Sequence, residues 1–195
     1  MVPLVHITAA AFDVDIALAY ATADNFTGRP VYRADARCLL HADAALRLRR
    51  AAELARPLGL RLKVLDAFRP AEAQWVLWNH SPDPDFLADP RRGSLHSMGV
   101  AVDLALVDAG SGAAVDMGTP FDAFTPRSHH GDREIPAAAQ HNRHLLLGLM
   151  TAAGWDYYRN EWWHYQLSDA RARYPLLGDS VLGGEGLMPG GGRRP

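Results

Sequence analysis

Two short stretches, far apart in the sequence, carry residues that together suit metal chemistry. The first reads Ser-Leu-His-Ser-Met-Gly-Val-Ala-Val-Asp and offers the imidazole of His96 and the carboxylate of Asp103. The second reads Glu-Trp-Trp-His and adds the imidazole of His164. Two imidazoles and one carboxylate are a ligand set that can hold a catalytic zinc ion and leave its fourth position open for water. Glu161 is then a spare carboxylate that could move protons.

Each of these residues also has a purely structural interpretation. A histidine near a strand is more often a buried structural residue than a ligand. An aspartate inside a Val- and Leu-rich strand, as at Asp103, is more unusual because a buried carboxylate needs a partner. Glu161 and His164 would face opposite sides of a regular strand, so they converge only if the chain bulges or twists there. Taken together, the residues indicate a zinc hydrolase without defining its substrate.

Several other polar residues are compatible with more than one role. His129 and His130 are adjacent in a loop-like stretch, where they could bind a metal or simply form hydrogen bonds. Asp66 lies in a predicted strand and Arg69 follows its end, and the two could be an ordinary surface ion pair. No function is assigned to the remaining histidines, which are His6, His41, His80, His141 and His144.

The pattern of apolar residues predicts an α+β domain. Helices are expected over residues 43–56, 71–78 and 136–153, because apolar stripes at helical spacing end at Gly or Pro. Strands are expected over residues 60–68, 100–107, 155–158 and 161–167, the last two as a hairpin. Asp103 shares one face of its strand with Ala101 and Ala105, and these small neighbours leave space for an ion.

The composition limits the class of protein. The chain has 195 residues, 48% of them hydrophobic, and a net charge of −2, which suits one globular domain and indicates neither nucleic acid nor membrane as a partner. The single cysteine, Cys38, excludes an intrachain disulfide and a cysteine-rich zinc site. We find no signal-like or membrane-spanning segment and expect a cytoplasmic protein. The domain should cover residues 1–182, followed by a disordered Gly- and Pro-rich tail at 183–195.

Beyond these observations, the sequence resembles a known family. The pattern Ser-x-His-x-x-Gly-x-Ala-x-Asp at residues 94–103, followed by Glu-x-x-His at 161–164, is similar to the signature of the zinc DD-peptidase superfamily. The Hedgehog signalling domain has the related fold. Further stretches resemble the VanX-like D-alanyl-D-alanine dipeptidases of that superfamily, and they are residues 20–28, 66–70, 117–122, 127–130 and 161–165.

The resemblance implies a Hedgehog/DD-peptidase-like fold, with a small antiparallel sheet and packed helices, and one Zn²⁺ per chain. It implies that Glu161 is the catalytic base and that Arg69 faces the transition state. The implied zinc ligands are His96, Asp103 and His164.

The same resemblance implies a small dipeptide, D-Ala-D-Ala, as the substrate, and a role in cell-wall precursor metabolism. Asp122 and Tyr20 match positions that hold the free amino terminus of the substrate, and Ser94 matches one near its carboxylate end. The stretch Ser81–Gly93 is short beside longer relatives, so the wall of the site there is expected to differ.

Two alternatives stay open, and the sequence does not indicate an oligomeric state. The chain could be a DD-carboxypeptidase or an L-alanyl-D-glutamate endopeptidase of the same superfamily. It could also be a non-catalytic, zinc-stabilised binding module. Glu161 and Arg69 argue against the binding module, because a purely structural zinc site needs neither residue.

Overall fold

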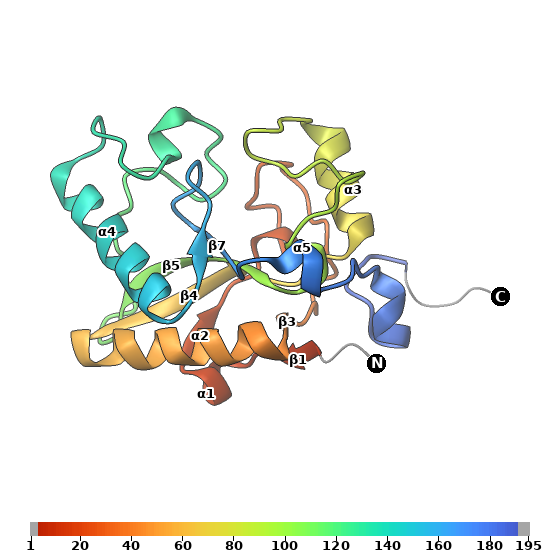
Figure 1. Ribbon diagram of the computed structural model, residues 1–195, viewed down its shortest axis with the longest axis horizontal. Coiled ribbons are helices and arrows are strands. Elements are labelled where there is room, and N and C mark those ends of the chain that lie inside the picture. Colours follow the sequence, from red (N-terminus) through yellow and green to blue (C-terminus); the bar gives the residue numbers. More distant parts are fainter. Residues whose placement is uncertain (1–3, 191–195) are drawn as a thin grey trace.

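The structure, a computed structural model, describes residues 4–190 and is built on a five-stranded sheet (Figure 1). All neighbouring strands run antiparallel except the edge strand β2, which is parallel to β4. In sheet order the strands are β2 (Val14–Ile16), β4 (Leu60–Asp66), β5 (Ala101–Asp108), β7 (His164–Gln166) and β6 (Asp156–Tyr157). The expected α+β fold, a small antiparallel sheet with packed helices, is confirmed.

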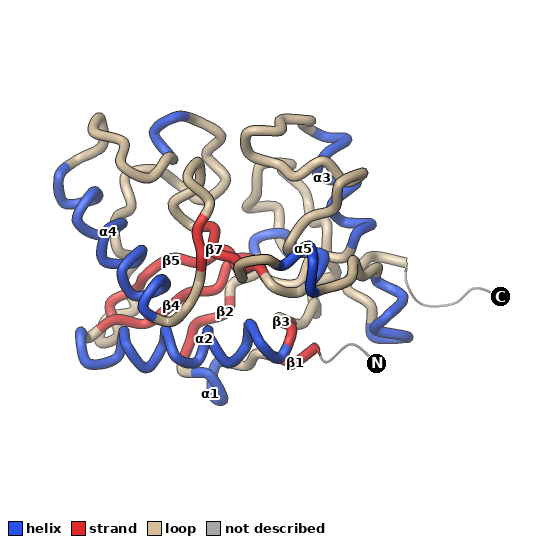
Figure 2. The backbone as a smooth tube through the Cα atoms, viewed as in Figure 1, coloured by secondary structure: helices blue, strands red, loops and turns tan. Residues whose placement is uncertain are grey.

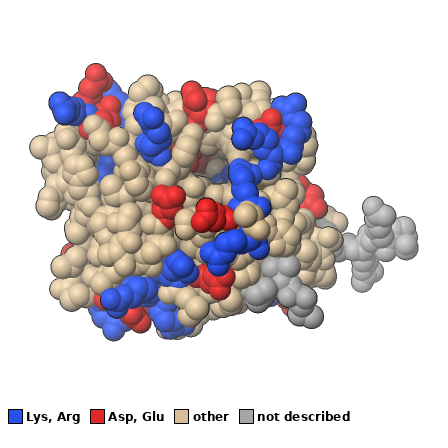
Figure 3. Space-filling view, viewed as in Figure 1, with Lys and Arg blue, Asp and Glu red and all other residues tan. Residues whose placement is uncertain are grey.

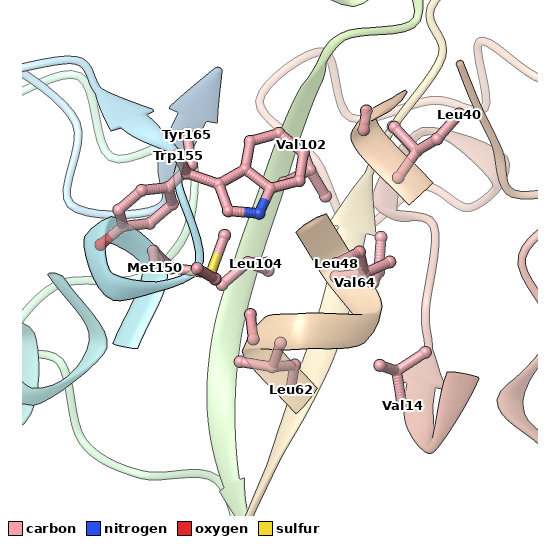
Figure 4. Close-up of a cluster of buried hydrophobic side chains, with 14 of the residues drawn as sticks. Val14, Leu40, Leu48, Leu62, Val64, Val102, Leu104, Met150, Trp155 and Tyr165 are labelled. Atoms are coloured by element: carbon pink, nitrogen blue, oxygen red, sulfur yellow. The ribbon is translucent and has the colours of Figure 1, made fainter. Parts of the chain in front are cut away.

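One face of the sheet carries the main hydrophobic core. Alternate residues of the two central strands are fully buried there, and they are Leu62, Val64, Val102, Leu104 and Leu106. Two long helices, α2 (Ala42–Ala55) and α4 (Ala137–Ala152), complete this core, and Figure 4 shows Leu48 of α2 and Met150 of α4 within it. Complete burial of each such side chain contributes about 1.5–3 kcal/mol, so this face fixes the register of the central strands.

A second, smaller core lies beside the sheet. It contains aromatic residues such as Tyr20, Tyr32 and Phe68, together with Leu77 of α3 (Ala71–His80). The remaining elements are short: β1 (Leu4–His6), α1 (Ala9–Phe12), β3 (Leu39–His41), α5 (Ala170–Arg173), and the 3₁₀ segments Ala19–Ala21, Arg56–Leu58, His96–Met98, Pro126–Ser128 and Asp179–Glu185. All of these except Asp179–Glu185 have three or four residues, too few positions to show a periodic pattern, and the sequence did not predict them.

Long connections cover much of the other side of the sheet (Figure 2). Asp103 points to this side, because its neighbours Val102 and Leu104 belong to the main core on the opposite face. The main hydrophobic core therefore lies on one face of the sheet, and Asp103 lies on the other.

The prediction of a hairpin over residues 155–167 is only partly correct. Strands β6 and β7 pair, but they are shorter than expected, and residues 158–163 form turns between them. The backbone NH of Glu161 donates to Tyr158 O at 3.2 Å, and that of His164 donates to Glu161 O at 3.3 Å. Glu161 and His164 would face opposite sides only if both lay on one regular strand. Glu161 does not belong to a strand, so the two side chains can face the same side.

Residues 183–190, which the sequence predicts to be disordered, include a packed anchor in the structure. Leu187 is 1% exposed and lies in the second core. Its backbone NH donates to Asp179 Oδ1 at 2.6 Å, and its carbonyl accepts from the NH of Arg33 at 2.8 Å. One apolar side chain with two backbone hydrogen bonds thus docks a segment whose composition suggested disorder, while residues 191–195 lie outside the described residues. Among residues 4–190, no helix has the length and apolar character needed to cross a membrane.

Candidate active site

Strand register brings the three predicted metal ligands together. Asp103 on β5 is directly opposite His164 on β7, so their side chains emerge side by side. His96 lies in a 3₁₀ turn that ends at Gly99, just before β5. Gly99 has φ 71°, and a Cβ there would lie 3.2 Å from the backbone nitrogen of His41. Only glycine fits this turn without strain, and the turn returns His96 toward Asp103.

The ligand atoms are spaced as a tetrahedral ion requires. His164 Nδ1 lies 3.0 Å from Asp103 Oδ1 and 3.1 Å from His96 Nε2, and His96 Nε2 lies 3.3 Å from Asp103 Oδ1. Bonds of about 2.0–2.1 Å to a tetrahedral zinc ion place its ligand atoms about 3.3 Å apart. The donor set therefore fits a divalent ion of this kind, and these three residues form the group that can hold a metal ion among the described residues.

Each imidazole is oriented by a partner on its far side. His96 Nδ1 lies 2.8 Å from Ala67 O, and His164 Nε2 lies 3.1 Å from Gln166 Oε1. Both partners accept a hydrogen bond, so each ring carries its proton on the far side and presents a lone pair to the shared space. Burial raises the pKa of Asp103, and protonated His96 and His164 rings would outweigh burial and hold that pKa well below its usual value.

Glu161 supplies a carboxylate beside this ligand group. Its side chain is buried, and Oε2 lies 3.7 Å from His164 Nδ1. Burial, reinforced by the carboxylates of Asp103 and Asp122, raises the pKa of Glu161 well above its usual value, while Arg69 opposes the shift. A divalent cation on the three ligands would draw this pKa down again. Glu161 thus occupies a position where its proton affinity depends strongly on nearby charge, as a proton-transfer group requires.

Arg69 is a buried member of the same site and not part of a surface ion pair. Its Nε donates to Asp66 Oδ2 at 2.8 Å, and its Nη2 lies 3.5 Å from Asp103 Oδ2. The pairing of β4 with β5 shifts register between Val64 and Asp66, which places Asp66 opposite Asp103. This irregularity turns the Asp66 side chain to the face that carries Asp103, where it anchors the guanidinium.

Tyr20 and Asp122 form a second polar group. The Tyr20 hydroxyl donates to Asp122 Oδ1 at 3.2 Å, and Asp122 Oδ2 is buried without a hydrogen-bond partner. Burial and the charge of Asp103 raise the pKa of Asp122 to about 8. Asp122 adopts a left-handed conformation, φ 59°, which aspartate tolerates better than most residues. A carboxylate oxygen left unpaired in this way is suited to a cationic ligand.

One cavity of about 380 Å³ joins these groups. Figure 3 shows the molecule hollowed on the viewed face, with basic side chains beside the hollow. In Ser94, a further residue of the cavity wall, the hydroxyl oxygen accepts from the NH of His96 at 3.2 Å. The cavity is lined by every residue that the sequence assigned to the site: Tyr20, Arg69, Ser94, His96, Asp103, Asp122, Glu161 and His164.

Comparison with known proteins agrees with this arrangement. A family model described as D-ala-D-ala dipeptidase, of the M15 peptidases, matches residues 2–179. The chain belongs to this dipeptidase family. A D-alanyl-D-alanine dipeptidase of Escherichia coli K12 is 47% identical over 167 residues, which are 86% of this chain and 85% of that protein. The D-alanyl-D-alanine dipeptidases of Enterococcus faecalis and Streptomyces coelicolor are each 36% identical, over 77% of this chain and 84% of their own length.

In this member of the dipeptidase family, His129 and His130 lie outside the cavity wall. Neither belongs to the group of side chains that can hold a metal ion. The His129 ring packs against Phe86 and the His130 ring against Tyr157, with ring centres 5.9 and 5.0 Å apart. Burial, together with the charge of Arg143, lowers the pKa of His130 to about 4. Both rings thus pack against aromatic side chains, and neither joins the metal-ligand group of His96, Asp103 and His164.

Sequence reasoning missed several residues that shape the dipeptidase site. Gln74 and Gln166 hold Arg69 and His164 through side-chain hydrogen bonds, but a single glutamine in a sequence carries no distinctive signal. Arg143 on α4 is 2% exposed and donates to the carbonyl oxygens of Met117, Arg127 and His129. An arginine at an apolar position of a predicted helix was the available signal for this buried residue, which fixes the loop that carries Asp122.

Proposed function

We propose that the protein hydrolyses the dipeptide D-Ala-D-Ala to two D-alanines with one bound Zn²⁺, as part of cell-wall precursor metabolism. The observation that carries the proposal is the single cavity in which the metal-ligand group, the carboxylate of Glu161 and the unpaired oxygen of Asp122 all meet. The family relationship supports the same substrate, because the related proteins are named as D-alanyl-D-alanine dipeptidases.

His96, Asp103 and His164 would hold the zinc ion. When bound, zinc lowers the pKa of a water molecule toward neutrality and polarises the scissile carbonyl. The protein side chains orient this chemistry, since Ala67 O and Gln166 fix the two imidazole rings through hydrogen bonds on their far sides.

Glu161 is proposed as the group that moves protons. It accepts the proton of the attacking water and then gives it to the amine that leaves from the broken peptide bond. Its carboxylate lies 3.7 Å from the ligand atom of His164, which supports this role.

Arg69 is proposed to stabilise the oxygen that becomes negative in the tetrahedral transition state. Its guanidinium stays cationic, and the charge of Asp66 holds the pKa of Arg69 above its usual value despite burial. The Nη2 group faces Asp103 and the cavity, where the charge develops. A fixed buried cation stabilises such a charge without having to reorganise during the reaction.

Asp122 and Tyr20 are proposed to bind the free ammonium group of the dipeptide, and Ser94 to lie near its carboxylate end. An ammonium group would satisfy the unpaired Oδ2 of Asp122. An acylated peptide has no such cation and would leave a buried carboxylate oxygen without a partner, which is unfavourable by several kcal/mol. This difference favours a dipeptidase over a carboxypeptidase or an endopeptidase that acts on longer chains.

The proposal is tested by comparing D-Ala-D-Ala with N-acetyl-D-Ala-D-Ala as substrates of the parent protein and of Asp122→Ala. The parent should cleave the free dipeptide and leave the acetylated compound almost untouched. Asp122→Ala should lose most of its activity on the free dipeptide and lose little, or gain, on the acetylated one. Equal cleavage of both compounds by the parent would replace the dipeptidase proposal with the carboxypeptidase alternative.

A further inference from the structure

Gln74 is a buried polar side chain that no step of the proposed reaction uses. It lies in the second turn of α3 and is 1% exposed. Its Oε1 accepts from Arg69 Nη1 at 2.9 Å, and its Nε2 donates to the carbonyl oxygen of Ala88 at 2.7 Å. One amide therefore connects the buried guanidinium to the connection that follows α3, and Ala88 in that connection lines the cavity.

The chemistry of the two partners fixes the orientation of this amide. A guanidinium has only donors, so it needs the carbonyl end of Gln74. The backbone oxygen of Ala88 has only lone pairs, so it needs the NH₂ end. Rotating the amide by half a turn would set donor against donor and acceptor against acceptor. The Gln74 side chain thus has one favourable arrangement, and that arrangement is specific for a cation on one side and a carbonyl on the other.

The same contacts fix the plane of the Arg69 guanidinium. Asp66 binds Nε at 2.8 Å and Gln74 binds Nη1 at 2.9 Å. Two held nitrogens, together with Cδ bonded to Nε, determine the plane of the rigid guanidinium, so the third nitrogen, Nη2, is directed at Asp103 and the cavity. Asp66 alone leaves rotation about its contact with Nε possible, and Gln74 removes that freedom. A neutral amide achieves this without adding a third carboxylate to Asp66 and Asp103, which would further offset the positive charge of the guanidinium.

We propose that Gln74 is a positioning residue that acts through Arg69, holding its guanidinium in the orientation that serves the transition state and linking it to the cavity wall at Ala88. The inference rests on the role given to Arg69 in the proposed function. This role of Gln74 differs from ordinary packing, because substitution of Gln74 should affect turnover only when the Arg69 guanidinium is present.

The first experiment measures steady-state kinetics of Gln74→Met with D-Ala-D-Ala. Methionine has a similar size but offers neither end of the amide. A misplaced group near reacting atoms can reduce turnover about 100-fold, so we expect kcat to fall by about 10- to 100-fold, with KM and zinc content close to those of the parent. The matched control is Leu77→Ala, a fully buried residue of the same helix outside the active site. It should lower the melting temperature and leave kcat near the parent value.

The decisive comparison repeats Gln74→Met in an Arg69→Ala background. If Gln74 acts through Arg69, the substitution should change kcat there by less than about threefold. An equal fold-loss in both backgrounds would overturn the inference and make Gln74 a structural residue. Parent-like kcat in Arg69→Ala alone would instead refute the role of Arg69 in the proposed function, so the two failures are distinguishable. If Arg69→Ala does not fold, Arg69→Lys provides the background, since its ammonium lacks the planar fork.

Ligand binding supplies a readout that does not depend on turnover. A phosphinate analogue of the dipeptide carries the tetrahedral geometry and negative charge of the transition state. Calorimetry should show that Gln74→Met weakens binding of this analogue about as much as it lowers kcat, while binding of D-alanine is unchanged. Unchanged affinity for the phosphinate would contradict the inference.

Discussion

His164 on β7 lies directly opposite Asp103 on β5, and its Nδ1 atom is 3.0 Å from the Asp103 carboxylate. The two residues are 61 positions apart in the sequence, so the sheet creates this contact. A slip of one residue in the pairing would turn one of the two side chains into the core. The candidate metal centre therefore depends on the same register that the buried leucines and valines stabilise.

Removing the metal should affect both stability and activity. Ion binding to the native protein alone stabilises it, by about 2.7 kcal/mol when the free ion is at 100 times its dissociation constant. Chelation should therefore lower the melting temperature and abolish hydrolysis of D-Ala-D-Ala, and stoichiometric Zn²⁺ should restore both. Metal analysis before and after chelation is the control. Full activity in a preparation shown to be free of metal would contradict the proposed centre.

Asp122 should make the metal-free protein less stable as the pH rises. Its pKa is raised to about 8 in the folded protein, so the folded state keeps a proton that the unfolded chain, with a pKa of about 3.9, has released. Between these values unfolding releases this proton, and the free energy of unfolding falls with increasing pH. Asp122→Asn does not titrate, so its stability relative to the parent should grow by about 3–4 kcal/mol from pH 5 to pH 8. The free energy of unfolding is measured with denaturant at each pH. If it changed with pH in the same way for both proteins, Asp122 would already be ionised in the folded state.

Leu187 should be an anchor of the C-terminal segment. It is 1% exposed, and truncating a buried leucine to alanine costs about 2–5 kcal/mol. Leu187→Ala should lower the free energy of unfolding by an amount in this range. Val181, which is 48% exposed in the same segment, is the matched control, and Val181→Ala should change stability by less than about 0.5 kcal/mol. If denaturant unfolding showed an equally small change in the free energy of unfolding for both variants, this segment would not dock in solution.

Asp103 and the stretch from Glu161 to His164 were predictable because their residue types are unusual at their positions in the sequence. Asp103 interrupts a strand of apolar residues, and the Glu-Trp-Trp-His stretch adds an imidazole and a carboxylate near the end of the domain. The resemblance to the dipeptidases then supplied Arg69 and Asp122, whose types alone indicate nothing special. In the structure all of these residues line one cavity.

The remaining features depend on tertiary contacts that no local pattern encodes. The turns at residues 158–163 replace a predicted strand, because backbone hydrogen bonds within the segment, such as that from Glu161 to Tyr158, take the place of a ladder. The irregularity near Asp66 is visible only once β4 is paired with β5. Docking of Leu187 depends on a pocket formed by distant residues, and Gln74 becomes informative only when both of its partners are in place.

The central claim is that Glu161 moves protons at a metal centre that cleaves D-Ala-D-Ala. The most direct test is the rate of D-alanine release by zinc-loaded parent protein and by Glu161→Gln at equal zinc content. General-base catalysis contributes about 10²–10⁴-fold, so Glu161→Gln should bind zinc as the parent does and release D-alanine slower by about that factor. Release of D-alanine at the parent rate, or loss of zinc from the variant, would contradict the account.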